Sequence, residues 1–175
     1  IRNSTISGNS ADDSSAISAS GLRTIANSTI SGNTSTSTRY TASTIFAGKT
    51  LTLRNSTVAF NRAANGAAIW FNNQKYKSNA HYAVDFESSI VANNTSNGVE
   101  SDVYSQVQPN TVLTITGANN IVMSASVKVA LPGDTRARDP LLLPLANNGG
   151  PTQTQAFRDG SPAFGNGSNP SGFAN

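Results

Sequence analysis

The stretch Asn3-Ser4-Thr5-Ile6-Ser7-Gly8-Asn9 decides the fold, because the same seven residues return at 27–33 and a softened copy stands at 55–61. Stepping along the chain from the apolar residue of each copy gives intervals of 24, 28, 32 and 31 residues. A period of about 20 to 50 residues is typical of stacked-repeat proteins, in which each unit buries its apolar face against its neighbours. The sequence therefore predicts about five stacked repeats with one inward column: Ile6, Ile30, Val58, Ile90 and Ile121.

Within the repeats, apolar residues alternate with small polar ones at period two, as in Leu51-Thr52-Leu53, which is the periodicity of β-strands. No stretch keeps a helical period. Each repeat divides into three short runs: the one around the apolar residue, a middle run and a closing run. This pattern predicts an all-β parallel β-helix, or solenoid, of about five three-stranded coils over residues 1–130. The middle runs are at 16–19, 43–47, 67–71, 103–107 and 126–130.

The recurring asparagines need a physical reason, because asparagine is poor in strand interiors. At a corner between strands it tolerates the left-handed backbone conformation and bonds to neighbouring backbone. We expect one asparagine ladder at Asn3, Asn27 and Asn55, and a second one at Asn9, Asn33 and Asn61. The alternative, that the Asn-Ser-Thr triplets are N-glycosylation sites, explains the triplets but not their register with the apolar column.

The composition excludes several function classes. Twelve basic and nine acidic residues are scattered and give a net charge of +3, so there is no electrostatic footprint of a nucleic-acid binder. There is no cysteine, no metal-ligand spacing and no apolar run long enough to span a membrane, and nothing indicates a cofactor. The chain opens inside a repeat, so we expect an export signal and further repeats upstream, or end-to-end self-association of exposed strand edges.

After Ala130 the repeat pattern stops, and residues 131–175 are dense in turn formers around an apolar core at 139–145. The open end of a solenoid exposes its core and its unpaired strand edges. We therefore expect residues 131–175 to form a C-terminal cap packed on the solenoid end.

The tail contains Asp139-Pro140-Leu141, the run Pro144-Leu145-Ala146-Asn147-Asn148-Gly149-Gly150-Pro151-Thr152-Gln153-Thr154 and Gly160-Ser161-Pro162-Ala163. These segments resemble the C-terminal signature of the choice-of-anchor Q family, which comprises bacterial surface or secreted right-handed parallel β-helix proteins. The upstream repeats, with Asn65-Gly66-Ala67-Ala68-Ile69, also resemble those of polymorphic outer-membrane proteins. The resemblance implies a right-handed helix, export and display at the cell surface, and no particular activity. One departure is Phe164-Gly165-Asn166, where the family usually has Ile-Asp after the preceding alanine.

Insertions at corners carry the candidate ligand-binding residues. The longest, at 72–83, follows Trp70 and contains Lys75, Tyr76, Lys77, His81 and Tyr82. A shorter one at 34–41 contains Arg39 and Tyr40. Aromatic rings and cations of this kind stack on sugar rings and pair with acidic groups of polysaccharides. The alternative is that Trp70 ends a core strand and the insertion is only a loop at a corner, without a binding role.

Enzymatic activity has less support. Asp85, Glu87, Glu100 and Asp102 are candidates for a polysaccharide lyase or hydrolase, but alternation also puts Asp85 and Glu87 on an ordinary solvent face. Asp12-Asp13 fits a turn better than a glycosidase pair. The sequence thus favours a structural or adhesive surface module that presents loops to a polysaccharide or another surface protein, without catalytic residues. The alternative is a polysaccharide lyase or glycoside hydrolase, or an inactive relative of one.

Overall fold

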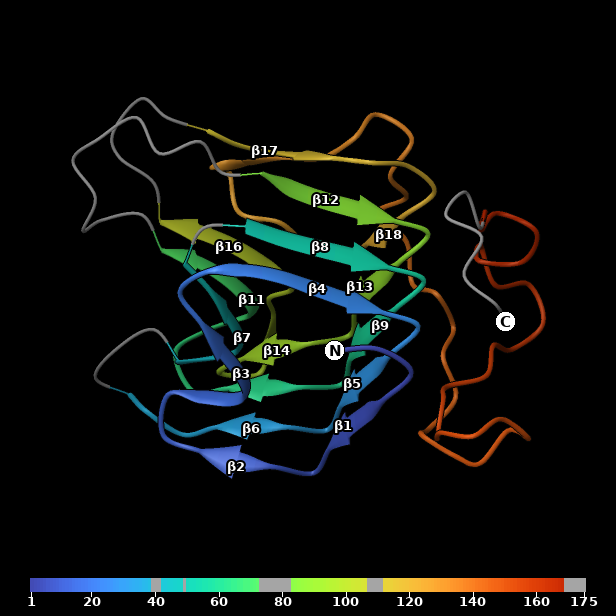
Figure 1. Cartoon of the computed structure of the whole chain (residues 1–175), viewed down its shortest axis with the longest axis horizontal. Coiled ribbons are helices and arrows are strands. Elements are labelled where there is room, and N and C mark those ends of the chain that lie inside the picture. The colour runs from blue at the N-terminus through green and yellow to red at the C-terminus, as the bar shows by residue number, and fades with distance from the viewer. Residues whose placement is uncertain (39–41, 49, 73–82, 107–111, 169–175) are drawn as a thin grey trace.

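The computed structural model describes residues 1–38, 42–48, 50–72, 83–106 and 112–168. These residues form short strands and no helix, and the strands belong to four sheets (Figure 1). Neighbouring strands run parallel, except for one antiparallel pair formed by β14 and β15. The predicted all-β architecture with parallel strands is therefore confirmed, and the arrangement is consistent with a solenoid.

The sheets are numbered here by the order in which the chain first enters them. Sheet 1 consists of β1 (Thr5–Ser7), β5 (Thr29–Ser31), β9 (Thr57–Ala59), β13 (Ile90–Ala92) and β18 (Ile121–Val122). Sheet 2 consists of β2 (Ser10–Ala11), β6 (Thr34–Ser35), β10 (Arg62–Ala63), β14 (Thr95–Ser96) and β15 (Val99–Glu100). Sheet 3 consists of β3 (Ser14–Ala19), β7 (Ala42–Ala47), β11 (Gly66–Asn72) and β16 (Val103–Gln106). Sheet 4 consists of β4 (Leu22–Ala26), β8 (Thr50–Arg54), β12 (Val84–Glu87), β17 (Leu113–Thr116) and β19 (Val129–Ala130).

The chain visits sheets 1 to 4 in turn and then returns to sheet 1, so each of the first three repeats contributes four strands rather than the three that the sequence predicts, and the fourth repeat adds the hairpin strand β15. The additional strands are those of sheet 2, which are only two residues long. Alternation over two residues gives no periodic signal, which is why the sequence pattern merges them with the corner before sheet 3.

The inward column of sheet 1 also differs from the prediction after Val58. Ile6 pairs with Ile30 and Ile30 with Val58, as expected, but Val58 pairs with Val91 rather than Ile90. Ile90 instead aligns with Thr57 on the opposite face of the sheet, and Ile121 continues that outer row. A shift of one residue exchanges the two faces of a strand. The outer row thus becomes apolar where the C-terminal tail covers it.

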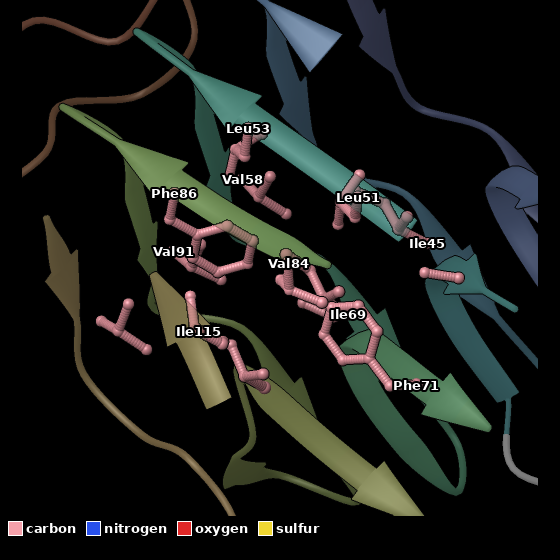
Figure 2. Close-up of a cluster of buried hydrophobic side chains, with 14 of the residues drawn as sticks. Ile45, Leu51, Leu53, Val58, Ile69, Phe71, Val84, Phe86, Val91 and Ile115 are labelled. Atoms are coloured by element: carbon pink, nitrogen blue, oxygen red, sulfur yellow. The ribbon is translucent and has the colours of Figure 1, made fainter. Parts of the chain in front are cut away.

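One continuous apolar core lies between sheets 1, 3 and 4, and the inward residues of each strand supply it (Figure 2). Phe71 and Phe86 are among its largest fully buried side chains, together with Leu51, Leu53 and Ile69. Buried aliphatic and aromatic side chains of this kind stabilise a fold by about 1.5–3 kcal/mol each. The core therefore explains why β-branched and leucine residues recur in every repeat.

The stack continues past the last full repeat. Three parallel pairings extend sheets 3, 4 and 1 in that order: Val103 with Ala125, Leu113 with Val129, and Ile121 with Arg136. The segment 124–136 therefore forms a partial further layer over the end of the stack.

The tail that follows does not lie on the end of the stack, where the sequence predicts a cap. Residues 139–158 run along the outer face of sheet 1, beside β18, β13, β9, β5 and β1, instead of across an end of the stack (Figure 1). Leu142 is buried there against Ala59, Ile90, Ala92 and Ile121. The Gln155 amide donates a 3.0 Å hydrogen bond to the hydroxyl of Ser31, and Thr5 donates one of 2.7 Å to the Gln153 carbonyl. The apolar outer row explains this position, because its burial favours lateral packing of the leucine-rich segment.

The corner between sheets 4 and 1 requires a left-handed backbone in every repeat. The residues there have φ between 45° and 59°: Asn3, Asn27, Asn55, Ser88 and Asn119. We expect Asn27→Val to lower the free energy of unfolding by roughly 1–2 kcal/mol, because a β-branched residue tolerates this conformation poorly. Thermal melting of the variant measures the loss. Asn27→Gly is the matched control and should melt close to the wild type, since glycine adopts positive φ without strain; equal melting of the valine variant would contradict the argument.

Candidate functional site

A row of buried amides runs through the stack at the entry to sheet 2. Asn9 donates from Nδ2 to Oδ1 of Asn33, Asn33 to Asn61, and Asn61 to Asn94, each at 2.9 Å. Asn94 then donates at 2.8 Å to the carboxylate of Asp102. All four bonds point the same way, so the ladder has a direction and ends on an acceptor.

Each buried member of this ladder has its hydrogen-bonding capacity filled. In Asn61, Oδ1 accepts the backbone N–H and the amide of Asn33, while Nδ2 donates to Asn94 and to the Ile30 carbonyl. Buried polar groups are tolerated in a core when they are satisfied in this way. The ladder therefore holds the corner between sheets 1 and 2 in register through the stack.

Asp102 takes the place that the asparagine of a further repeat would occupy. The hairpin of β14 and β15 folds back over its own repeat, and Oδ1 of Asp102 accepts the backbone N–H and the amide of Asn94. Its Oδ2 accepts the N–H of Ser124 at 2.9 Å. Burial raises the pKa of Asp102 to about 6, although the hydrogen bonds from Asn94 and Ser124 oppose this shift and nearby Glu100 adds to it.

The predicted ladder at Asn3, Asn27 and Asn55 has a different form. The asparagines bond to the next repeat through their backbone N–H groups, and the row of side chains that links repeats involves the next residue, because the N–H of Ser4 donates to the hydroxyl of Ser28 and that of Ser28 to Ser56. The series continues from Ser56 to Ser89 and ends when the N–H of Ser89 donates to Oδ1 of Asn120. The asparagines supply the left-handed turn and the serines supply the ladder.

A groove of about 1090 Å³ lies where the C-terminal tail meets the outer side of sheet 2. Its floor is the end of the amide ladder, including Asn61 and Asn94. Strands β6, β10 and β14 form one wall with Thr34, Arg62 and Thr95, and the tail forms the other. The strands of sheet 2 and the C-terminal tail, which are distant in sequence, thus build one concave surface. The side chains that project from its walls include Phe60, Arg62, Glu100, Asp139, Leu141 and Arg158.

Several groove residues have a left-handed backbone. Phe60 has φ 57°, Asn93 58°, Asn97 48° and Leu141 53°. Phe60 follows the same strand as Gly8, Gly32 and Asn93 do in other repeats, and all of these have positive φ. Glycine and asparagine suit this conformation, but a bulky residue is strained in it. Phe60 and Leu141 are therefore bulky residues in a backbone conformation that favours glycine or asparagine.

The charged groups of the groove are of both signs. Asp139 is held in its own turn, where Oδ1 accepts the Leu141 N–H at 2.8 Å and the Asn93 amide at 3.4 Å. Arg62 and Arg158 are exposed, and the one salt bridge found among the described residues joins Arg54 to Asp85 outside the groove. Two guanidinium groups are thus available in the groove.

Of the predicted ligand-binding residues, only Trp70 belongs to the described part of the chain; Arg39, Tyr40, Lys75, Tyr76, Lys77, His81 and Tyr82 lie outside it. Trp70 points outward from β11 but is only 5% exposed, because Phe46 and Tyr104 pack edge-on against it at 6.1 and 6.2 Å. This aromatic row joins β7, β11 and β16 on the outside of sheet 3. Aligning the middle runs of the repeats could have revealed it, since the three aromatics share one register position.

The carboxylates considered for catalysis do not gather in one place. Asp85 pairs with Arg54 on sheet 4, and Glu87 accepts a hydrogen bond from the Ser168 hydroxyl at 3.2 Å. Glu100 lines the groove, and Asp102 is buried in the ladder. In the described ranges, no group of three or more His, Asp or Glu side chains is placed to hold a metal ion. Those ranges also contain no helix long and apolar enough to cross a membrane.

Comparison with known proteins adds no relative. No family model matches the chain, and neither the curated proteins nor the solved structures gave a match. The residues themselves are therefore the basis for any proposal about function.

Proposed function

We propose that this protein is a non-catalytic structural or adhesive module that holds an extended carbohydrate strand in the groove between sheet 2 and the C-terminal tail. The observation that carries the proposal is the groove itself, an open surface of about 1090 Å³ whose lining includes the exposed ring of Phe60 and the exposed side chains of Arg62 and Arg158. Sugars bind to such surfaces through ring stacking and hydrogen bonds. Another surface protein is the second kind of partner that this surface would suit.

The proposal includes a right-handed parallel β-helix with repeats over residues 1–130 and a tail over 131–175. It also includes an extracellular or cell-surface location in a bacterium. Supporting it are the cyclic order of the sheets and the resemblance of residues 139–163 to the choice-of-anchor Q family. End-to-end association belongs to the same proposal, because β1, β2 and β3 each stand at the edge of their sheet.

The test is a panel of neutral and acidic polysaccharides incubated with the folded protein, with both retention and cleavage followed. We expect retention of at least one extended glycan by affinity electrophoresis, with no shortening of the glycan. Absence of retention across the panel would contradict the binding function.

A lyase or hydrolase is the second candidate, because Glu100 and Asp139 both line the groove. Most glycosidases use a pair of carboxylates as catalytic residues. Cleavage by the wild type that disappears in Glu100→Gln would favour this candidate over the binding module. Cleavage that survives in Glu100→Gln would exclude this carboxylate pair.

A further inference from the structure

We propose that the groove selects glycans whose rings carry carboxylate groups, with Phe60 as the stacking surface and Arg62 and Arg158 as the partners of the carboxylates. The inference rests on the proposed carbohydrate-binding function and adds the charge of the ligand to it. It follows from three features of the groove: a strained and exposed aromatic ring, two guanidinium groups without a salt bridge, and the use of Asp139 within its own turn.

No contact within the described part of the chain explains why residue 60 is a phenylalanine. Its backbone at φ 57° suits glycine or asparagine, which occupy the equivalent corners at Gly32 and Asn93. Its side chain is 38% exposed and belongs to neither of the two apolar clusters formed by the described residues. Strained residues that make no compensating core contact are typical of ligand-binding surfaces. An exposed ring at a groove wall offers a flat apolar face to the C–H side of a pyranose.

Arg62 and Arg158 give the groove its preference for anions. Arg62 projects from the middle strand of sheet 2, and Arg158 comes from the tail, so the two approach the groove from its opposite walls. Neither takes part in the salt bridge found among the described residues. A guanidinium donates two parallel hydrogen bonds to a carboxylate, which gives both energy and orientation.

Asp139 keeps its negative charge in the same lining, but hydrogen bonds within the tail fix its position. Its Oδ1 already accepts the Leu141 N–H and the Asn93 amide, which hold the turn that forms the tail wall. Glu100, from the β14–β15 hairpin, is the other carboxylate that the described residues contribute to the lining. A ligand with carboxylates spaced along a chain meets the arginines on the two walls and places its uncharged ring edges near Glu100.

The first experiment compares two forms of one polymer. Oligogalacturonate and its methyl ester have the same rings and linkages, but only the former carries carboxylates. Titration calorimetry at low salt should give at least about tenfold tighter binding of the acid form, as expected for a charge-assisted pair, and the difference should shrink as salt is added. Equal affinity for the two forms would overturn the inference while leaving carbohydrate binding intact. Failure of both forms and of every other glycan would count against the proposed function itself.

The second experiment separates binding from folding. Phe60→Gly should weaken oligogalacturonate binding about tenfold without lowering the melting temperature, because glycine relieves the positive φ. Arg62→Gln and Arg158→Gln should each remove most of the preference for the acid over the ester, whereas Arg138→Gln, an exposed arginine outside the groove lining, should leave it unchanged. Unchanged binding in Phe60→Gly, or an effect of Arg138→Gln equal to that of the groove arginines, would overturn the assignment of these residues.

Discussion

Replacing Asn61 with leucine is expected to lower the free energy of unfolding by roughly 3–6 kcal/mol, although the two side chains have similar volumes. Oδ1 of Asn61 accepts two N–H groups of Asn33, one from the backbone at 3.0 Å and one from the amide at 2.9 Å. Asn33 is fully buried, so no water replaces the lost acceptor. Each buried donor left without a partner costs about 1–3 kcal/mol, and the carbonyl of Ile30 loses a donor as well.

The chain contains a matched control for this substitution. Asn9 stands at the exposed end of the same ladder, where it donates to Asn33 but accepts from no further member among the described residues. Asn9→Leu should therefore cost less than about 1.5 kcal/mol, the ordinary net value of one hydrogen bond. Urea denaturation of both variants measures the difference. Similar losses in the two variants would mean that the ladder is stabilised by side-chain volume and not by its hydrogen bonds.

The sequence predicts the general architecture because the information for it is local and repeated. Alternation around Leu51 and Leu53 identifies strands, and the return of Asn-Ser-Thr-Ile at a nearly constant interval identifies stacking. The left-handed corners also follow from single residue types, since Asn27 and Asn55 are placed where only a few side chains tolerate positive φ.

The predicted inward column is wrong in the fourth repeat because neighbouring residues set the register of the strand. In the fourth repeat, Ser88 takes the left-handed position and Ser89 the ladder position, which moves the inward residue from Ile90 to Val91. A single-residue shift cannot be recognised from an apolar pair such as Ile90-Val91, because either member suits the core. The register becomes visible only when the serine ladder is known.

The groove was beyond prediction for a different reason. It forms because the tail runs back along sheet 1 to sheet 2, which brings Arg158 into the same groove lining as residues such as Arg62 that are distant in sequence. The sequence suggested a cap at the end of the stack, since nothing in the leucine-rich run states which apolar surface it covers. Phe60 could not be identified as a candidate ligand-binding residue either, because the argument for it depends on its φ angle and not on a sequence motif.

Asp102 is expected to make the protein more stable in mild acid than at neutral pH. Its pKa is raised to about 6 in the folded protein from 3.8, so the folded state holds the proton more tightly than the unfolded chain does. The resulting stabilisation is complete below pH 3.8 and is lost as the pH rises through about 6. The shift corresponds to a loss of about 3 kcal/mol between these limits, at 1.36 kcal/mol for each pKa unit.

Asp102→Asn separates this effect from the titration of the other acidic residues, which is common to both proteins. The asparagine keeps an oxygen for Asn94 but cannot ionise, and its amide faces the N–H of Ser124 in place of an acceptor. Denaturant unfolding of the two proteins from pH 4 to pH 7 should therefore show that the wild type loses stability relative to the variant by about 2 kcal/mol as the pH rises, since part of the full effect lies below pH 4. A difference that stays constant with pH would mean that the four donors around the carboxylate offset its burial. In that case Asp102 would be ionised at the end of the ladder. The hydrogen bonds of the ladder, which all donate toward Asp102, would then stabilise its negative charge.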